Sequence, residues 1–350
     1  MKTALITGVT GQDGAYLAKF LLSKGYEVFG TYRRLSTPNF WRLNYLGIMK
    51  KINLISMDLN DTTSIIECIE VSQPDEIYHL AAQSFVGASF EQPIATGEST
   101  GLATTRMLEA MLKHSKDIKF YNASTSELYG NSSLAPLDEI TPFKPQSPYA
   151  AAKLYSYSMT KLYREAYGLF AANGILFNHE SPIRGLEFVT RKITNSIAKI
   201  KLGLEKKIVL GNIESFRDWG YAPDYVEGMW KMLQHEAPDD FVLATGETHS
   251  VNEFLMLSCQ FANLLPEDVL EVSGNLKRPL EVHQLVGNPS KAKSELNWTH
   301  RMKFRDLVKV MTEEDISRWD SFLNGKPIIW DAQNYDDNYN IIRTRYKMDS

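Results

Sequence analysis

Short apolar runs rich in β-branched residues alternate with helix-like segments through the first 180 residues. The runs lie at residues 3–8, 27–32, 52–57, 76–82, 118–124 and 169–177. Segments whose apolar residues recur at helical spacing lie between several of them, at 15–25, 62–73 and 102–115. Buried strands that alternate with helices form βαβ units, whose strands pair in parallel. The pattern therefore predicts an α/β fold with a Rossmann-type, doubly wound parallel sheet.

The pattern loosens from about residue 181, where prolines and glycines punctuate mixed segments and helical spacing returns at 251–263 and 303–323. We therefore expect a second, smaller mixed α/β part that binds the substrate and is built partly from insertions. We expect residues 1–180 to form the Rossmann domain, to which a later segment at about 217–245 returns. The smaller, substrate-binding part then comprises 181–216 and 246–318. Residues 319–350 are expected to form a C-terminal extension.

Three glycines follow the first apolar run at a spacing typical of dinucleotide-binding turns. In ITGVTGQDG, Gly8, Gly11 and Gly14 lie between a predicted strand and a predicted amphipathic helix. Glycine there permits a tight turn and lets backbone N–H groups approach a pyrophosphate at the positive end of the helix. Glycine turns are common, so the trio alone is weak evidence. The strand before it and the helix after it favour a dinucleotide site.

Composition and cysteine use favour a cytoplasmic enzyme. The chain of 350 residues is 43% hydrophobic and 23% charged, with a formal net charge of −4 and no long run of like charge. This balance argues against nucleic acid or a membrane surface as a partner. Cys68 and Cys259 lack metal-type spacing, which fits a reducing compartment. We find neither an apolar signal segment at the start nor any run of 18 apolar residues.

The end of the second predicted strand favours NADP over NAD. Thr31 and Tyr32 stand where NAD enzymes usually carry an acid for the ribose hydroxyls, and Arg33 and Arg34 follow. Guanidinium groups suit a 2′-phosphate, although two arginines on a loop can also be a solvated turn. Asp58, beyond the third strand, could accept from an adenine amino group, but an isolated Asp there is more often a turn former or helix cap.

A Tyr-x-x-x-Lys pair indicates hydride-transfer chemistry. Tyr149 and Lys153 share one face of a helix expected to start at Pro148. A nearby ammonium is expected to lower the phenol pKa, so that the tyrosinate acts as a base. Most such pairs are only a helix surface. Here a Ser-Thr-Ser sequence with Thr125 precedes the pair at the end of a strand, and Glu127 follows Thr125 although simple hydride transfer does not need it.

These motifs together resemble the extended short-chain dehydrogenase/reductase family and, within it, the GDP-mannose 4,6-dehydratases. The resembling segments are ITGVTGQDGAYLAKFLL, LAAQSFVGASFEQP, ASTSELYG, SPYAAAKLY, GILFNHESPIRGLEFVTRKIT, RDWGYAPDYV, FVLATG and RPLEVHQLVGNPSKAK. The likeness extends from about residue 2 to about residue 315. It implies conversion of a GDP-hexose to its 4-keto-6-deoxy sugar.

The resemblance assigns catalytic roles that include Glu127. Tyr149 would take the proton of the 4-hydroxyl while hydride leaves C4 for NADP, and Thr125 would hydrogen-bond O4. Glu127 would remove the C5 proton and then protonate the departing C6 hydroxyl, after which hydride returns to C6. Lys153 would hold the nicotinamide ribose. Since no cofactor is consumed, NADP is expected to be tightly bound. An arbitrary Glu would more often be a helix cap or a surface carboxylate.

Further site residues follow from the resemblance by motif position. Those for the cofactor are Gly8, Gly11, Gln12, Asp13, Gly14, Arg33, Arg34, Ser36, Asp58, Leu59, Leu80, Ala82, Ser84, Tyr149, Lys153, His179 and Arg184. Those for the nucleotide sugar are Ser84, Glu127, Asn178, Val189, Lys192, Arg217, Arg278 and Glu281. His179 and Glu180 lack a second ligand at the i+4 position, so we expect no metal.

Departures from the family pattern leave the sugar open. Ile183 stands where many members have another Arg, and Ala95 replaces a Tyr that some members place near the cofactor. GDP-manno-heptose is therefore an alternative substrate. A nucleotide-sugar 4-epimerase or reductase would not need Glu127, and a non-enzymatic NADP-binding sensor would not need the catalytic set. The resemblance also implies a homodimer or homotetramer, with residues 33–42 near a neighbouring subunit in tetramers.

Overall fold

A parallel sheet forms the centre of the computed structural model, which describes residues 1–37, 39–273, 280, 282–327 and 341–342. Its strand order is β11-β6-β5-β4-β1-β2-β3-β15, and all neighbouring pairs are parallel. The strands are β1 (Thr3–Thr7), β2 (Glu27–Tyr32), β3 (Asn53–Ser56), β4 (Glu76–His79), β5 (Lys119–Thr125), β6 (Ala171–Leu176), β11 (Asp240–Leu243) and β15 (Ile341–Ile342). The six strands predicted from the sequence and the doubly wound fold are confirmed.

Helices cover both faces of this sheet. On one face, α1 (Gln12–Ser23) packs against α9 (Ala222–Gln234), and Leu17, Leu21, Met229 and Leu233 belong to one buried cluster there. The other face carries α3 (Thr62–Ser72), α6 (Ala103–His114) and α7 (Pro148–Tyr167), with a second cluster beneath α3 and α6. Shorter elements around the sheet are α2 (Trp41–Tyr45), η1 (Met49–Lys51), α4 (Val86–Glu91), α5 (Pro93–Thr96), the π-helix η2 (Gly97–Leu102), η3 (Ser126–Tyr129) and α12 (Ser290–Glu295).

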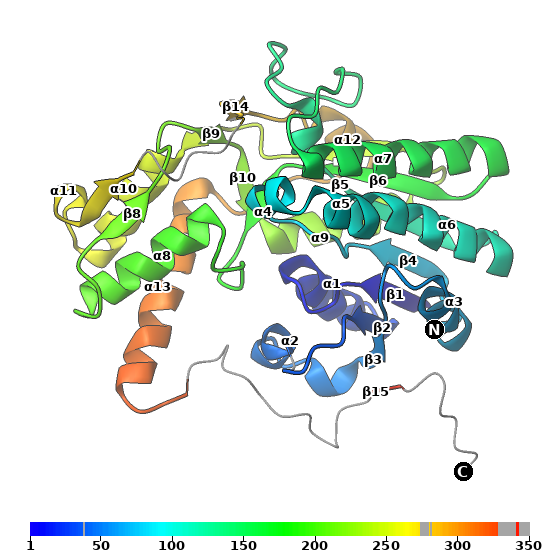
Figure 1. Ribbon diagram of the computed structural model, residues 1–350, viewed down its shortest axis with the longest axis horizontal. Coiled ribbons are helices and arrows are strands. Elements are labelled where there is room, and N and C mark those ends of the chain that lie inside the picture. The colour runs from blue at the N-terminus through cyan, green and yellow to red at the C-terminus, as the bar shows by residue number, and fades with distance from the viewer. Residues whose placement is uncertain (38, 274–279, 281, 328–340, 343–350) are drawn as a thin grey trace.

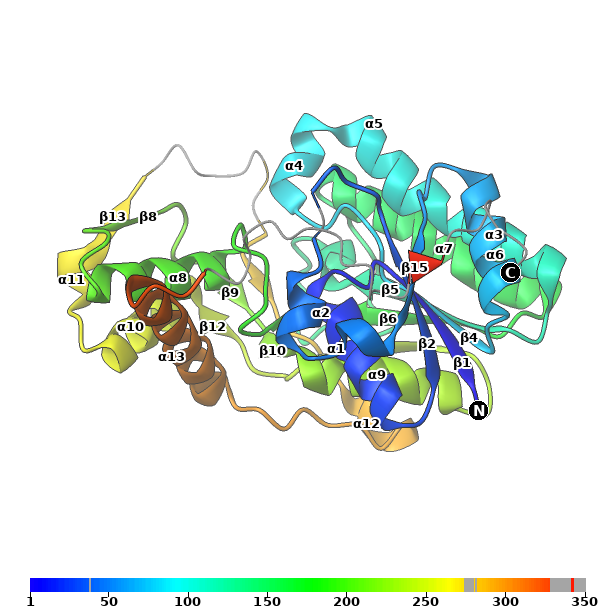
Figure 2. The ribbon, with the colours of Figure 1, turned by 90° about the horizontal axis from the view of Figure 1, so that it is seen from below.

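A smaller lobe lies beside the sheet, on the left of Figure 1 and Figure 2. Its helices are α8 (Val189–Lys201), α10 (Val251–Ala262), α11 (Pro266–Val269) and α13 (Phe304–Leu323). Its strands are β8 (Ile208–Leu210) paired with β13 (Leu270–Val272), and β9 (Phe216–Arg217) between β12 (His249–Ser250) and β14 (Gln284–Leu285). A third buried cluster fills it, and the fully buried ion pair of Arg191 with Asp315, at 2.7 Å, joins α8 to α13.

A two-strand connection leads from the sheet to the lobe. β7 (Asn178–Glu180) follows β6 after one residue and pairs in parallel with β10 (Trp219–Tyr221). The sequence pattern did not predict these three-residue strands, because they are too short to show a period. They place the NHE and RDWG motifs side by side.

The C-terminal region departs from a simple extension. α13 ends at Leu323, so the segment assigned to an extension from residue 319 begins within that helix. Further along, Ile341 and Ile342 pair in parallel with Leu54 and Ile55 at the edge of the sheet. The division into domains remains a prediction. Within the described part of the chain, no helix is both long enough and apolar enough to cross a membrane.

Candidate active site

A cavity of about 700 Å³ opens between the carboxyl ends of the central strands and the smaller lobe. In open α/β sheets this end of the strands is where ligands bind. The predicted site residues that line it are Asp13, Leu80, Ala82, Ser84, Thr125, Glu127, Tyr149, Lys153, Asn178, His179, Arg184, Val189, Lys192 and Arg217. Residues distributed over some 200 positions are thus brought together around one space.

The turn between β1 and α1 needs glycine at two positions. Gly8 has φ +70°, and a Cβ there would lie 3.0 Å from the Cα of Ala81. A Cβ on Gly14 would lie 2.5 Å from the Gly8 carbonyl oxygen. The bare backbone and the N-terminus of α1 that it exposes are the cradle that a dinucleotide pyrophosphate requires. These residues therefore fit a bound nicotinamide dinucleotide.

The residues assigned to the adenosine end lie outside this cavity. Arg33, Arg34 and Ser36 are exposed on the loop after β2. Asp58 accepts a hydrogen bond at 2.9 Å from the backbone N–H of Asn60, which is the turn-forming role that an isolated Asp often has. Leu59 follows on the same turn after β3.

Thr125 and Tyr149 come together at the junction of β5 and α7. Thr125 is the last residue of β5, and its hydroxyl accepts the backbone N–H of Glu127 at 3.2 Å. Tyr149 lies in the first turn of α7, where the Ser147 side chain caps the helix. Burial raises the pKa of Tyr149 to about 12, and its hydrogen bond with Thr125 opposes that rise. The predicted lowering of the phenol pKa is therefore wrong, because burial dominates.

The Lys153 ammonium is directed at the backbone of β5. Its Nζ donates a hydrogen bond to the Ala123 carbonyl oxygen at 2.6 Å, and the residue is only 5% exposed. Burial lowers the pKa of Lys153 to about 8. Lys153 is thus held one turn from Tyr149, in a site that disfavours its charge.

Glu127 lies on the cavity wall beside this pair. It belongs to η3, directly after the Thr125 cap, and its charge contributes to the raised pKa of Tyr149. The backbone of η3 and the start of α7 therefore aim a carboxylate and a phenol at the same space. A phenol and a carboxylate with separate positions can handle two different protons of one substrate.

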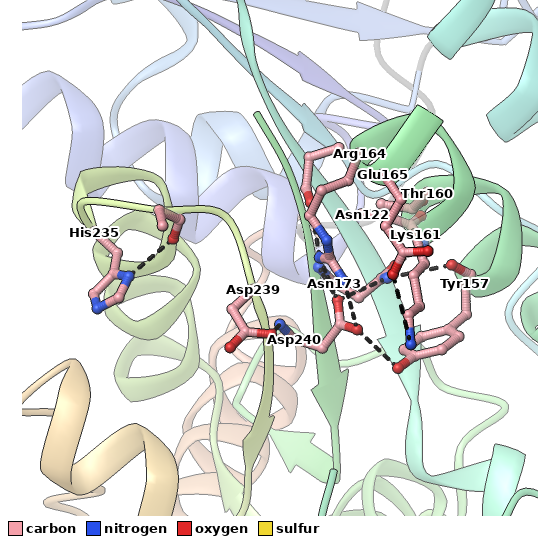
Figure 3. Close-up of polar contacts among 12 residues, drawn as sticks. Asn122, Tyr157, Thr160, Lys161, Arg164, Glu165, Asn173, His235, Asp239 and Asp240 are labelled. Atoms are coloured by element: carbon pink, nitrogen blue, oxygen red, sulfur yellow. Dashed lines mark hydrogen bonds and ion pairs between the residues drawn. The ribbon is translucent and has the colours of Figure 1, made fainter. Parts of the chain in front are cut away.

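The α7 helix is fastened to the sheet at its far end by a buried polar network (Figure 3). Arg164 forms two hydrogen bonds to Asp240 at the start of β11, at 2.8 and 3.0 Å, and Tyr157 donates to the same carboxylate at 2.8 Å. Asn173 of β6 joins Asp240 to Asn122 of β5, with distances of 3.0 and 2.8 Å. The network was not predicted, since its members are scattered between residues 122 and 240 of the sequence.

The lobe side of the cavity carries basic groups held by backbone carbonyls. Lys192 donates to the Val209 carbonyl oxygen at 2.7 Å, and Arg217 donates to that of Phe216 at 2.8 Å. Asn178 and Val189 line the cavity near them. Arg278 and Glu281, also predicted for the nucleotide sugar, lie outside the described residues.

Other cavity residues were missed by sequence reasoning. Phe85 and Phe188 meet edge to face with ring centroids 5.9 Å apart, and both line the cavity. Apolar residues carry no chemical signal in a sequence. Glu180 accepts the Thr190 hydroxyl at 2.6 Å and pairs with Arg184 at 3.2 Å.

The two departures from the family pattern lie away from the cavity wall. Ile183 is fully buried in the cluster that includes Phe40 and Leu43. Ala95 is exposed on α5. Neither is among the residues that line the cavity.

The family model and the similar curated proteins carry the same description. The family model described as GDP-mannose 4,6 dehydratase matches residues 5–311. GDP-mannose 4,6 dehydratase 1 of Arabidopsis thaliana is 50% identical over 325 residues, covering 90% of each chain. The Homo sapiens GDP-mannose 4,6 dehydratase is 48% identical, covering 89% of this chain and 91% of its own.

Solved structures share the fold at low sequence identity. dTDP-glucose 4,6-dehydratase of Bacillus anthracis in complex with NAD has a TM-score of 0.80 at 17% identity, covering 91% of this chain and 98% of that one. RMD from Pseudomonas aeruginosa complexed with NADPH has a TM-score of 0.76 at 22% identity, covering 91% and 100%.

Proposed function

The chain belongs to the GDP-mannose 4,6-dehydratase family, and from this premise we propose how its cavity carries out the family's reaction and with which cofactor. The enzyme is a dehydratase that converts GDP-mannose to its 4-keto-6-deoxy sugar. We assign the reaction to Thr125, Glu127, Tyr149 and Lys153. The observation that carries this assignment is the meeting of these four side chains at the ends of β5 and α7.

In the first step the 4-hydroxyl becomes a ketone. Tyr149 takes the O4 proton, and Thr125 donates a hydrogen bond to the oxygen as its charge develops. Lys153 binds the nicotinamide ribose and, as an ammonium, favours the tyrosinate. A nicotinamide cofactor held there would supply the hydride chemistry, with hydride taken from C4 and returned to C6.

Glu127 carries the elimination. The 4-ketone acidifies the C5 hydrogen, which Glu127 removes as a proton. The C6–O bond then breaks, and the same proton leaves with the hydroxyl as water. C5 needs one proton when C6 is reduced, and Tyr149 holds the one it took from O4. Each proton is thus accounted for by these two residues.

NADP is the cofactor we propose, retained from one turnover to the next. Arg33, Arg34 and Ser36, exposed after β2, offer cationic and hydroxyl groups to a 2′-phosphate. Gly8, Gly11 and Gly14 would leave room for the pyrophosphate, and the backbone at Gln12 and Asp13, at the start of α1, would supply N–H groups to it. Titration of cofactor-free protein with NADP and with NAD tests this choice: an equal affinity would contradict it.

We also propose that the protein is cytoplasmic and forms a homodimer or homotetramer. Buried, unpaired Cys68 and Cys259 fit a reducing cytoplasm. The family resemblance supports a homodimer or homotetramer. GDP-mannose is favoured over GDP-manno-heptose because the family model and the relatives described above are GDP-mannose 4,6 dehydratases, and the departures at Ile183 and Ala95 do not line the cavity.

The test of the reaction is incubation with GDP-mannose in deuterated water, followed by mass spectrometry. We expect loss of one water and gain of one deuterium at C5. An isomer of unchanged mass, or net consumption of NADPH, would overturn the proposal. A parallel incubation with GDP-manno-heptose measures the preference between the sugars.

A further inference from the structure

His179 lies between a backbone carbonyl oxygen and a carboxyl group that is acceptor-only when ionised. Its Nδ1 is 2.7 Å from the Phe177 carbonyl oxygen, and its Nε2 is 2.7 Å from Oδ2 of Asp13. Neutral imidazole has a single N–H and can satisfy one such acceptor. With Asp13 ionised, both hydrogen bonds form only when both ring nitrogens donate, so the geometry points to an imidazolium.

The charge of Asp13 supports this reading. Burial opposes its ionisation, but the charge and hydrogen bond of His179 hold the pKa of Asp13 at about 2. The pKa of His179 is raised, although burial alone would lower it, because Asp13 favours the cation. The imidazolium ring also stacks on Tyr225, with ring centroids 4.6 Å apart.

The side chain of Gln12 makes a second connection between α1 and the segment that contains His179. The Gln12 amide donates to Oδ1 of Asp13 and to the His179 carbonyl oxygen, both at 3.0 Å, and accepts the Ser181 hydroxyl at 2.7 Å. The side chains of Gln12 and Asp13, which the family resemblance assigned to the cofactor, therefore bind β7 and the turn that follows it. Only their backbone remains for a pyrophosphate.

The position of the pair gives it a function. Asp13 opens α1 directly after the glycine turn, whereas His179 belongs to β7, which leads to Arg184 and to α8. Both line the cavity together with Lys153 and Arg184. The pair consequently joins the glycine turn and the start of α1 to the segment that carries Asn178 and Arg184 on the cavity wall.

We propose that Asp13 is a positioning residue: it keeps His179 doubly protonated and locks the glycine turn to residues 178–184, so that the cofactor stays enclosed between turnovers. The inference rests on the proposed function, because a cofactor regenerated in every turnover has no need to leave. An ion pair with only a structural role would affect the stability of the fold and leave cofactor release unchanged.

Two substitutions of Asp13 separate the effect of its negative charge from the effect of its hydrogen bond to His179. Asp13→Asn keeps a hydrogen bond to a neutral His179, and Asp13→Ala removes it. Asp224→Asn is the matched control, because Asp224 also lies in the first turn of a helix, α9, and pairs with Arg301, but does not line the cavity. The measured quantity is the rate at which bound NADPH leaves the holoenzyme, followed by its fluorescence.

We expect release to accelerate about tenfold or more in Asp13→Ala, by less in Asp13→Asn, and to remain unchanged in Asp224→Asn. A release rate in Asp13→Ala within twofold of the unsubstituted enzyme overturns the proposal. If Asp13→Ala does not fold, the same criterion applies to Asp13→Asn.

A spectroscopic measurement tests the protonation itself. In protein labelled with ¹⁵N-histidine, both ring nitrogens of His179 should carry protons at pH 7.5, and Asp13→Asn should convert the ring to the neutral form. A neutral ring in the unsubstituted enzyme overturns the inference. Neither measurement uses the sugar, so a failure of the dehydratase assay and a failure of this proposal are distinguishable.

Discussion

The two ends of α7 use polar side chains in opposite ways. At the far end, Tyr157 and Arg164 are paired with Asp240 in a network of satisfied hydrogen bonds (Figure 3). At the cavity end, burial raises the pKa of Tyr149 to about 12 and lowers that of Lys153 to about 8. The far end stabilises the fold, whereas the cavity end holds two groups whose charged forms the protein disfavours. Such a division predicts that substitutions at the two ends separate stability from activity.

Replacing the phenol at the cavity end should have the largest effect. Tyr149→Phe removes the hydroxyl that we propose takes the O4 proton and keeps the ring. We expect turnover of GDP-mannose to fall by about 10⁴-fold, the upper range for a general acid–base group, with an unchanged melting temperature. A variant that retains more than a hundredth of the activity would show that another group is the base.

Glu127→Gln separates the two halves of the reaction. The amide cannot take the C5 proton, so we expect dehydration to fall by about 10³-fold while substrate still reduces the bound nicotinamide cofactor. The absorbance of NADPH at substrate addition reports the first half, and mass spectrometry reports the second. Unimpaired dehydration contradicts the role of Glu127. Loss of NADP reduction as well would assign the residue to oxidation.

At the far end of α7 we expect a substitution to lower stability and to leave activity nearly unchanged. Asp240→Asn removes the charge that faces the nearly buried Arg164, so we expect the free energy of unfolding to fall by about 3 kcal/mol. Activity per folded molecule should stay within about twofold, because the network lies away from the cavity. Denaturant unfolding and turnover at low temperature measure the two quantities.

The control for Asp240→Asn is the neighbouring Asp239→Asn. Asp239 pairs with Lys291 at 2.6 Å, but its side chain is 47% exposed. Exposed pairs contribute little, so we expect a loss of less than about 1 kcal/mol. Equal losses in the two variants would mean that the Asp240 network is not a special anchor.

The sequence predicted the cavity end of α7 far better than the far end. Helical spacing predicted that Tyr149 and Lys153 share one face, and the family resemblance placed Thr125 and Glu127 beside them. Asn122, Tyr157 and Asp240 meet only through the order of strands in the sheet, which spacing does not contain. The same limit hid β7 and the contact of Asp13 with His179.

Apolar residues of the cavity could not be predicted from the sequence for a second reason. Phe85 and Phe188 line the cavity but gave no signal, because apolar side chains are expected in any core. The phenol pKa was also predicted in the wrong direction. The spacing to Lys153 is visible in the sequence, whereas the burial that outweighs it depends on the folded surroundings.

The smallest predicted effect tests whether the cavity end costs stability. Lys153 has a folded pKa of about 8 against 10.5 for an ordinary lysine, so the unfolded chain binds its proton more tightly. Its contribution is therefore unfavourable below pH 8 and diminishes as the pH rises from about 8 to 10.5. The substitution Lys153→Met removes this cost and also the hydrogen bond to the Ala123 carbonyl oxygen.

We expect a net gain of about 1 kcal/mol in the free energy of unfolding of Lys153→Met at pH 7, with activity lost. Unfolding measured at pH 7 and pH 10 should show the gain disappear at the higher pH; a loss of stability at pH 7 would mean that the cavity end of α7 stabilises the fold as the far end does.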